Sequence, residues 1–410
     1  ANKREVFVVV NIQGMTAKQA VKDLQADYYA EALKAPEQGK LVAWVTSIAP
    51  REFLEAMDIV TIYPENHNAA IAAKKGSMAM LDIAEGMGYS NDICSYARVN
   101  LGYVEAGDCV AGKIPKPDLL FCCNNICNTV TKWYEILSRR LNVPLIMIDL
   151  PFSHNPSADK HAIDYIVGQF QNAIKQLEII CGKPFNYERF LESQKLSNQA
   201  ALLWKEVMNM GQTKPSPLNG LDMFNYMAQI GCSRGNEVAV EFFTLLRDEL
   251  AGKRARGEAY IENEKYRIIW DGIPFWFNLR AMSHAFKNNN ACMVASTYPD
   301  NWAVTYEVGN LRSMAQAYMG NFTNREFGFR YKNMLRLIEE FHADGVIMHS
   351  NRSCKNQDFA QYALAREVTK TLGTPIVVVD GDQDDPRAFS EGQFETRVQA
   401  LFEMIDQKRK

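Results

Sequence analysis

Short apolar runs alternate with amphipathic stretches over the first 150 residues of the chain. Apolar runs of strand length occur at 41–45, 58–63, 117–123 and 144–149. Helical periodicity marks the segments between them, at 17–33, 51–57, from 69 onward with an interruption near 76–77, and 126–141. Strands that alternate with helices in this way indicate parallel βαβ units with right-handed connections.

The pattern changes between about residues 159 and 253, where several helices follow one another without a strand. Strand-like runs then return at 266–270, 291–297, 345–348 and 375–380, and residues 391–410 predict a closing helix. We therefore expect an α/β fold with two small Rossmann-like or flavodoxin-like parallel-sheet domains and a helical segment between them. The expected boundaries are an N-terminal helical segment at 1–36, a first α/β domain at 37–160, a helical linker domain at 161–262 and a second α/β domain at 263–410.

Composition narrows the class of protein. With 410 residues, 47% of them hydrophobic, the chain can bury two or three cores. A net charge of -3 gives no nucleic-acid footprint, and no apolar run approaches the roughly 20 residues that span a bilayer. The apolar run at 6–10 is too short for a signal peptide. We expect a cytoplasmic protein with no nucleic-acid or membrane partner.

The chain has nine cysteines, an odd number that argues against a disulfide framework in such a protein. Three of the nine fall within residues 121–128 (FCCNNICN), where a buried strand should pass into a helix. Another, Cys94, follows the capping residues 90–92 near an expected helix start, where the helix dipole favours a thiolate. Packing in a core is the expected role of four others, namely Cys109, Cys181, Cys232 and Cys292.

The residues that follow each expected strand form a second pattern. In open parallel sheets, ligands bind beyond the carboxyl ends of the strands. These ends hold residues 46–47, 64–67, 123–127, 349–354 and 380–382. If the two α/β domains face each other across a cleft, Cys127 and Cys354 are placed to meet in it.

Cys94, Cys127 and Cys354 leave three interpretations open. Zinc and iron–sulfur clusters both prefer sulfur ligands, but structural zinc usually shows CxxC pairs and four ligands, and no CxxC pair occurs here. Three dispersed cysteines suit a cubane cluster with one iron left open. On spacing alone, simple packing of the three thiols in a core remains the favoured interpretation.

Other candidate side chains also have both a structural and a functional interpretation. Ser47 and Glu65 follow strands, where helix capping and turn formation are the common roles. His67 and His349 could carry protons or bind a metal, although a lone histidine is more often structural; His349 is the better candidate, as a group that lines a pocket. Trp44, Tyr63 and Phe275 could line a pocket as well, but aromatic residues are more often core.

Two familiar ligand motifs are not supported. Residues 380–384 (DGDQD) suggest a calcium loop, but Asp385 stands where the EF-hand requires glycine, so a turn is the better interpretation. The sequence also contains no GxGxxG or P-loop fingerprint for a nucleotide.

Several longer motifs resemble one known family. They are 63–66 (YPEN), 90–98 (SNDICSYAR), 123–128 (CNNICN), 214–220 (KPSPLNG), 349–355 (HSNRSCK) and 380–387 (DGDQDDPR). In this order they resemble the 2-hydroxyacyl-CoA dehydratase family, from about residue 26 to the end. The sequence is most similar to the α-type subunits of the lactoyl-, phenyllactyl- and 2-hydroxyisocaproyl-CoA dehydratases, and more distantly similar to benzoyl-CoA reductase subunits.

The resemblance implies a heterodimer of two homologous subunits, each with one [4Fe-4S] cluster on three cysteines in the interdomain cleft. By motif match the ligands are Cys94, Cys127 and Cys354, and one iron stays open for the substrate. Cys122 and Cys123 remain bystanders or lie behind the ligands. The resemblance also implies an ATP-dependent iron–sulfur activator protein as an electron donor.

The family's chemistry implies roles for two further residues. A single electron converts the (R)-2-hydroxyacyl-CoA thioester into a ketyl radical anion, which expels the hydroxyl group. The remaining radical has an acidic β-proton, and after its loss the electron is returned, so that an (E)-2-enoyl-CoA forms. Ser47 and Glu65 match positions that contact the substrate hydroxyl. Glu65 would assist departure of the hydroxyl or take the proton, and the sequence leaves both roles open.

The sequence leaves two alternatives to a dehydratase open. One is a subunit of an ATP-dependent reductase of the benzoyl-CoA type, and the other is an iron–sulfur subunit that only relays electrons. A zinc scaffold would instead give a colourless, air-stable protein.

Overall fold

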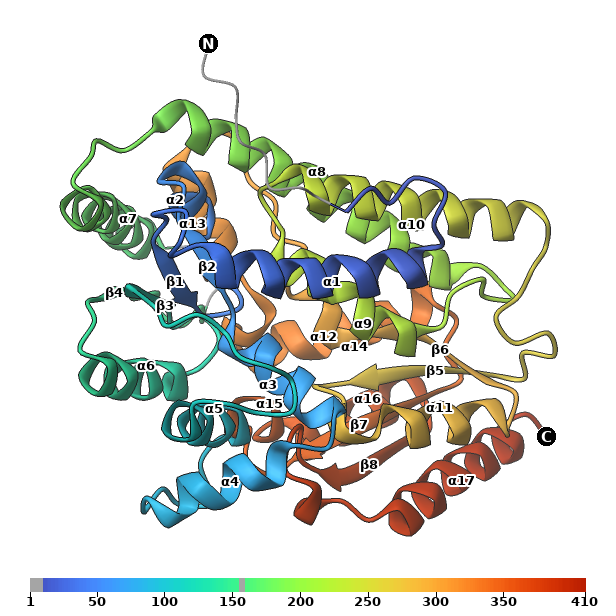
Figure 1. Cartoon of the computed structure of the whole chain (residues 1–410). Coiled ribbons are helices and arrows are strands. Elements are labelled where there is room, and N and C mark those ends of the chain that lie inside the picture. The colour runs from blue at the N-terminus through green and yellow to red at the C-terminus, as the bar shows by residue number, and fades with distance from the viewer. Residues whose placement is uncertain (1–9, 155–158) are drawn as a thin grey trace.

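The computed structural model describes residues 10–154 and 159–410, and within them the chain forms two four-stranded parallel sheets (Figure 1). The first sheet has the order β2-β1-β3-β4 and contains β1 (Val42–Val45), β2 (Val60–Ile62), β3 (Leu119–Cys123) and β4 (Leu145–Ile148). All three pairings are parallel. The predicted strands of the first half are confirmed. Residues 1–9 and 155–158, which belong to the expected N-terminal segment and first domain, lie outside the described residues.

The second sheet repeats the arrangement of the first, in the order β6-β5-β7-β8. It contains β5 (Tyr266–Asp271), β6 (Ala291–Ser296), β7 (Gly345–Asn351) and β8 (Ile376–Gly381). In each sheet the first strand along the chain pairs with the second strand on one side and with the third on the other, and the fourth strand lies beyond the third. The carboxyl ends of β1 and β3, and of β5 and β7, therefore flank the switch points at which such sheets bind ligands. The α/β fold class is confirmed, whereas the domain boundaries stay a prediction.

The helices of the first half differ from expectation at two starts. The half contains α2 (Glu52–Ala56), α3 (Pro64–Ala73), α4 (Ser77–Gly86), α5 (Ser95–Ala106) and α6 (Asn128–Leu141). Helix α3 begins at Pro64, directly after β2, because proline is well suited to a first helical turn. Cys94 occupies the N-cap position of α5, and residues 90–92 form a turn before it, so the prediction that residues 90–92 cap the helix is wrong.

The middle of the chain is helical, as predicted. It consists of α7 (Lys160–Cys181), α8 (Tyr187–Asn209), α9 (Gly220–Cys232) and α10 (Glu237–Ala255). Helix α1 (Ala17–Lys34) packs on α9 and α10, and Figure 1 shows it crossing in front of α9. Helix α9 also contacts α3 of the first half and β6 of the second. It therefore lies between the two sheets, where a ligand site is expected.

The helices of the second half pack on its sheet, with one exception. They are α11 (Leu279–Lys287), α12 (Thr297–Asp300), α13 (Leu311–Met319), α14 (Phe327–Glu340), α15 (Lys355–Asp358), α16 (Gln361–Leu372) and α17 (Glu391–Lys408). The exception is α13, which packs against α7 beside the first sheet. Among the described residues, no helix has both the length and the apolar character to cross a membrane.

The contact between α4 and α5 predicts a large effect of one added methyl group. Gly102 lies in α5, and a Cβ atom there would overlap the main-chain carbonyl group of Met80 in α4. We expect Gly102→Ala to lower the free energy of unfolding by about 1–3 kcal/mol, because the two backbones must separate. Thermal unfolding of the purified chain measures the change.

Gly168 provides the matched control. It lies in α7, and a Cβ atom there would meet nothing within 4 Å. Gly168→Ala should stabilise the chain by about 0.5–1 kcal/mol, because alanine loses less backbone entropy in a helix. Equal effects of the two substitutions would contradict the close approach of α4 and α5.

Candidate active site

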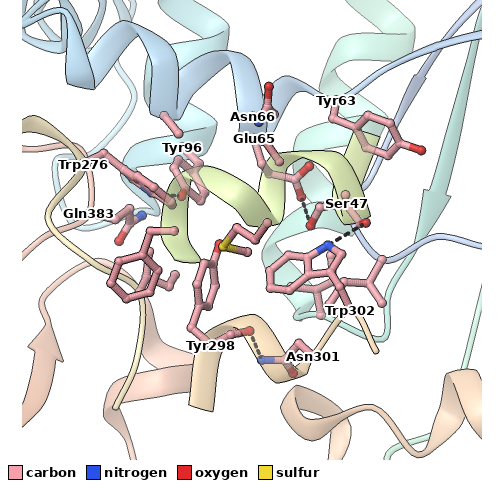
Figure 2. Close-up of a pocket in the computed structure, with 18 of the residues that line it drawn as sticks. Ser47, Tyr63, Glu65, Asn66, Tyr96, Trp276, Tyr298, Asn301, Trp302 and Gln383 are labelled. Carbon is pink, nitrogen blue, oxygen red and sulfur yellow. Dashed lines mark hydrogen bonds between the residues drawn. The ribbon is translucent and has the colours of Figure 1, made fainter. Parts of the chain in front are cut away.

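One pocket of about 210 Å³ is lined by residues from both halves of the chain and from α9. Its first-half residues follow β1, β2 and β3, and its second-half residues follow β5, β6, β7 and β8. Figure 2 shows Ser47, Glu65 and Trp302 grouped on one side and Tyr96, Trp276 and Gln383 on the other. The pocket therefore occupies the position that strand ends and switch points predict.

Cys94, Cys127 and Cys354 all line this pocket, and each occupies the same local position. They are the N-cap residues of α5, α6 and α15, and none of the three side chains makes a capping hydrogen bond. Two of these helices, α5 and α6, are long enough to present a sizeable dipole toward the pocket. The first N–H groups of a helix carry partial positive charge, which stabilises anionic sulfur nearby.

Burial acts on these thiols in the opposite direction. It raises the pKa of all three, and for Cys354 to about 12. The neighbouring sulfur of Cys127 raises the pKa of Cys354 further, and those of Cys354 and Cys127 raise the pKa of Cys94. Without a metal the thiols are therefore protonated at neutral pH, and a metal must displace these protons to bind.

The spacing of the thiols bears on the kind of metal they could hold. The described residues contain no group of three or more His, Cys, Asp and Glu side chains close enough to hold one metal ion. Zinc needs its sulfur ligands at about 2.3 Å and so brings them close together. An iron–sulfur cluster binds each thiolate through a different iron. Three sulfur donors that line one pocket suit a metal group that prefers sulfur ligands.

A chain of hydrogen bonds joins the backbone segments that carry two of the cysteines. The N–H group of Ser95 donates to Ser353 Oγ at 3.0 Å, and the N–H group of Ser353 donates to Asp382 Oδ2 at 3.2 Å. All three residues are buried. Gln383 Nε2 donates to the sulfur of Cys94 at 3.5 Å. We call the linked residues Ser95, Ser353 and Asp382 the serine–aspartate clamp.

The loop after β8 forms the base of this clamp. The other oxygen of Asp382, Oδ1, accepts the N–H groups of Asp384 and Asp385 at 3.0 and 3.1 Å. The loop is therefore a turn, as the sequence favours over a calcium site. The carboxylate of Asp385 also pairs with Arg98 of α5 at 3.2 Å, and Arg98 pairs with Glu85 at 2.6 Å. The ion pair between Arg98 and Asp385 therefore joins the two halves of the chain.

Ser47 and Glu65 face each other in the pocket. Ser47 follows β1 and Glu65 lies in the first turn of α3, and Ser47 Oγ is 3.5 Å from Glu65 Oε1. Trp302 Nε1 donates to the carbonyl oxygen of Ser47 at 3.2 Å. The second carboxyl oxygen of Glu65 is buried without a partner. Burial raises the pKa of Glu65 to about 7, so that its carboxyl group can hold or release a proton near neutrality.

Neither of the two candidate histidines, His67 and His349, lines the pocket. The prediction that His349 lines a pocket is therefore wrong. Strand β7 continues to Asn351, so His349 lies inside the strand rather than beyond its end. Its ring is packed by Phe275, and its Nδ1 atom is 2.5 Å from the carbonyl oxygen of Ile273. His67 contacts the carbonyl oxygen of Gly112 at 3.0 Å. Burial lowers the pKa of both histidines to about 4.

The remaining six cysteines differ in burial and in whether they line the pocket. Cys122 and Cys123 are buried in β3 and do not line the pocket, as expected of bystanders. Cys232 is buried as expected but also lines the pocket at the end of α9. Cys292 is buried, and Cys109 and Cys181 are only partly buried but pack against the hydrophobic cores, as predicted.

Several pocket residues were not among the sequence-based candidates. They are Tyr96, Trp276, Tyr298, Asn301, Trp302 and Gln383. Tyr96 and Gln383 lie within the motifs at 90–98 and 380–387, which is a signal for both. The carboxyl end of β6 would have indicated Tyr298 and Trp302. Of the aromatic candidates, Tyr63 lines the pocket, whereas Trp44 and Phe275 belong to the core.

Comparison with known proteins gives relatives over the whole chain. The (R)-2-hydroxyisocaproyl-CoA dehydratase alpha subunit of Clostridioides difficile is 45% identical, with 100% of this chain and 98% of the relative covered. The lactoyl-CoA dehydratase subunit alpha of Anaerotignum propionicum is 41% identical (96% and 97% covered). The (R)-phenyllactyl-CoA dehydratase alpha subunit of Clostridium sporogenes is 39% identical (96% of each).

A more distant relative belongs to a reductase. It is one of the subunits of the benzoyl-CoA reductase of Thauera aromatica and is 29% identical, with 95% of this chain and 94% of the relative covered. The family model described as 2-hydroxyglutaryl-CoA dehydratase, D-component, matches residues 46–405, which include the serine–aspartate clamp, Glu65 and the three helix-capping cysteines. The chain therefore belongs to the 2-hydroxyglutaryl-CoA dehydratase D-component family.

Proposed function

We propose that the chain is the α subunit of an (R)-2-hydroxyacyl-CoA dehydratase, a hydro-lyase that removes water to give an (E)-2-enoyl-CoA. The observation that carries the proposal is the single pocket that joins the Ser47–Glu65 pair to three helix-capping cysteines. The dehydratase relatives are more similar to the chain than the reductase subunit is, at 45%, 41% and 39% against 29% identity. A reductase is therefore the less supported alternative.

We infer that Cys94, Cys127 and Cys354 hold a [4Fe-4S] cluster with one open iron. Three partly buried thiols that line one pocket and leave their helix-capping positions unused, two of them on long helices, support a group that carries negative charge. When bound, the cluster supplies a Lewis-acidic iron for the thioester carbonyl and a path for a single electron. The cysteines fix its position, and the aromatic wall of the pocket excludes water.

We propose that Ser47 and Glu65 act on the same substrate group, the 2-hydroxyl. Ser47 Oγ lies beside Glu65 Oε1, so both side chains can hydrogen-bond one hydroxyl between them. A leaving hydroxide requires a proton, and a carboxyl group with a pKa of about 7 carries one in about half of the molecules at pH 7. Glu65 would therefore protonate the leaving hydroxyl group, while Ser47 orients it.

We infer two protein partners. The relatives are named as alpha subunits, which supports a homologous second subunit and a heterodimer. The family resemblance supports an ATP-dependent iron–sulfur activator that supplies the electron.

The proposed function is tested on the heterodimer, purified anaerobically and incubated with activator, ATP and a panel of 2-hydroxyacyl-CoA esters. Iron without dehydration of any ester would contradict the proposed function.

Replacement of Cys127 should remove the cluster. We expect Cys127→Ala to lower the iron and sulfide content and the visible absorption of the anaerobic protein, because one of three ligands is lost. Cys123→Ala is the matched control, since Cys123 lies four residues earlier, buried in β3 and outside the pocket. Iron retained in Cys127→Ala, or lost equally in both variants, would contradict the ligand assignment.

Replacement of Glu65 should affect turnover and its pH dependence. Because Glu65 must be protonated to assist the leaving group, we expect wild-type kcat to fall as the pH rises above about 7. Glu65→Gln should lower kcat by roughly 100-fold or more and remove this dependence. A kcat that rises through pH 7 would make Glu65 a base. Unchanged turnover would instead favour a subunit that only relays electrons.

The same substitution should stabilise the chain at high pH. Burial raises the pKa of Glu65 from 4.5 to about 7, so the folded chain binds this proton more tightly than the unfolded chain. Stability from this group is present below pH 4.5 and is lost as the pH rises to about 7. Glu65→Gln should therefore raise the free energy of unfolding at pH 8 by on the order of 3 kcal/mol, and by less at pH 5.5. Thermal unfolding at the two pH values tests the difference.

A further inference from the structure

The pocket wall lacks a group that could pair with an anion. Among the described residues, no arginine, lysine or histidine lines the pocket, and Glu65 is its one carboxylate. The remainder is mostly aromatic and aliphatic, with scattered amide, hydroxyl and thiol groups. A wall of this composition binds apolar groups well and gives a second anionic group no partner.

Burial distinguishes the two ends of the pocket. At the outer end Ala73 and Asn225 are exposed, and Gln25 of α1 is half-buried. At the inner end, Ile48 and Met227 are buried. Glu65 is buried as well and lies beside the partly buried Ser47, so this pair belongs to the inner end. A substrate whose hydroxyl group meets this pair therefore places its acyl side chain inside and its CoA portion toward α1, α3 and α9.

Three buried arginines lie behind the wall and already have hydrogen-bond partners. One of them, Arg330, donates to the carbonyl oxygen of the pocket-lining Asn356 at 3.0 Å and to its Oδ1 atom at 3.3 Å. Arg51 pairs with the carboxylate of Glu55 and donates to the carbonyl oxygen of Cys232. Arg234 donates to the carbonyl oxygen of Ala49 at 3.0 Å and lies 3.6 Å from the carboxylate of Glu52. None of the three arginines lines the pocket, so none contacts a carboxylate on the substrate directly.

We propose that the enzyme takes 2-hydroxyacyl-CoA esters whose acyl side chain is uncharged and apolar, aliphatic or aromatic, and rejects those with a second carboxylate. This inference rests on the proposed function and specifies its substrate class. A buried carboxylate without a paired cation loses its hydration and gains no compensating contact. Proximity to the Glu65 carboxyl group adds repulsion whenever Glu65 is ionised.

Two esters of the same shape isolate the effect of charge. 2-Hydroxyglutaryl-CoA ends in a carboxylate, and 2-hydroxy-5-methylhexanoyl-CoA carries an isopropyl group in its place. Their dissociation constants are measured by calorimetry on the anaerobic heterodimer without activator, and their kcat/KM values with activator and ATP. We expect the diacid ester to bind and to react at least about 100-fold less well than the isosteric neutral ester.

The binding and turnover measurements separate two kinds of failure. A diacid ester within tenfold of the neutral ester in both affinity and kcat/KM would overturn the substrate class and leave the dehydratase in place. Absence of dehydration for both esters and for 2-hydroxyisocaproyl-CoA would overturn the proposed function, on which the substrate class depends.

A substitution at Met227 tests whether the wall itself sets the preference. Met227→Lys introduces a cation of similar length at the inner end, and the ratio of affinities should shift toward the diacid ester by at least about tenfold. Met227→Leu, which keeps the position apolar, should retain the wild-type ratio. A folded Met227→Lys protein with the wild-type ratio would contradict the inference; if that variant does not fold, the comparison of the two esters on the wild-type enzyme decides.

Discussion

The serine–aspartate clamp fixes the relation between two sheets that have separate hydrogen-bond ladders. Each sheet satisfies its own backbone groups, so neither requires the other for its secondary structure. The hydrogen bond between the Ser95 amide and Ser353 Oγ, together with the pairing of Arg98 and Asp385, sets how the helix start at Cys94 meets the loop that carries Cys354. Because the pocket is built from both halves, its shape depends on how they meet, to which contacts such as that of Trp302 with Ser47 also contribute.

The site lowers the stability of the chain that carries it. The pocket buries a carboxyl group with one oxygen unpartnered and three thiols whose pKa values burial raises. Destabilising groups of this kind are retained where the surrounding structure is stable enough to hold them in place. Here the surroundings are close backbone contacts such as that between Gly102 and Met80, and buried ion pairs such as that between Arg98 and Asp385. Affinity for substrate and cofactor would recover part of this cost.

The sequence predicts the strands well and the contacts across the pocket poorly. Strands of a doubly covered parallel sheet are continuously apolar, so runs such as 117–123 are visible without any partner information. The position of His349 depended on how far β7 extends, and element ends are the least predictable feature of a sequence. The pairing of Ser95 with Ser353 depends on two serines far apart in sequence, and serine occurs in many turns without any such role.

The position of the clamp residues along the chain has a consequence for biosynthesis. The last strand of the first sheet ends at Ile148, so this sheet can form early on the ribosome. The partner of Ser95 lies 258 residues later, and the aspartate that holds that partner comes later still. Until the final part of the chain emerges, the nascent protein therefore exposes an unfinished pocket wall that includes Cys94 and Cys127. Co-translational chaperones would have most reason to bind during this interval.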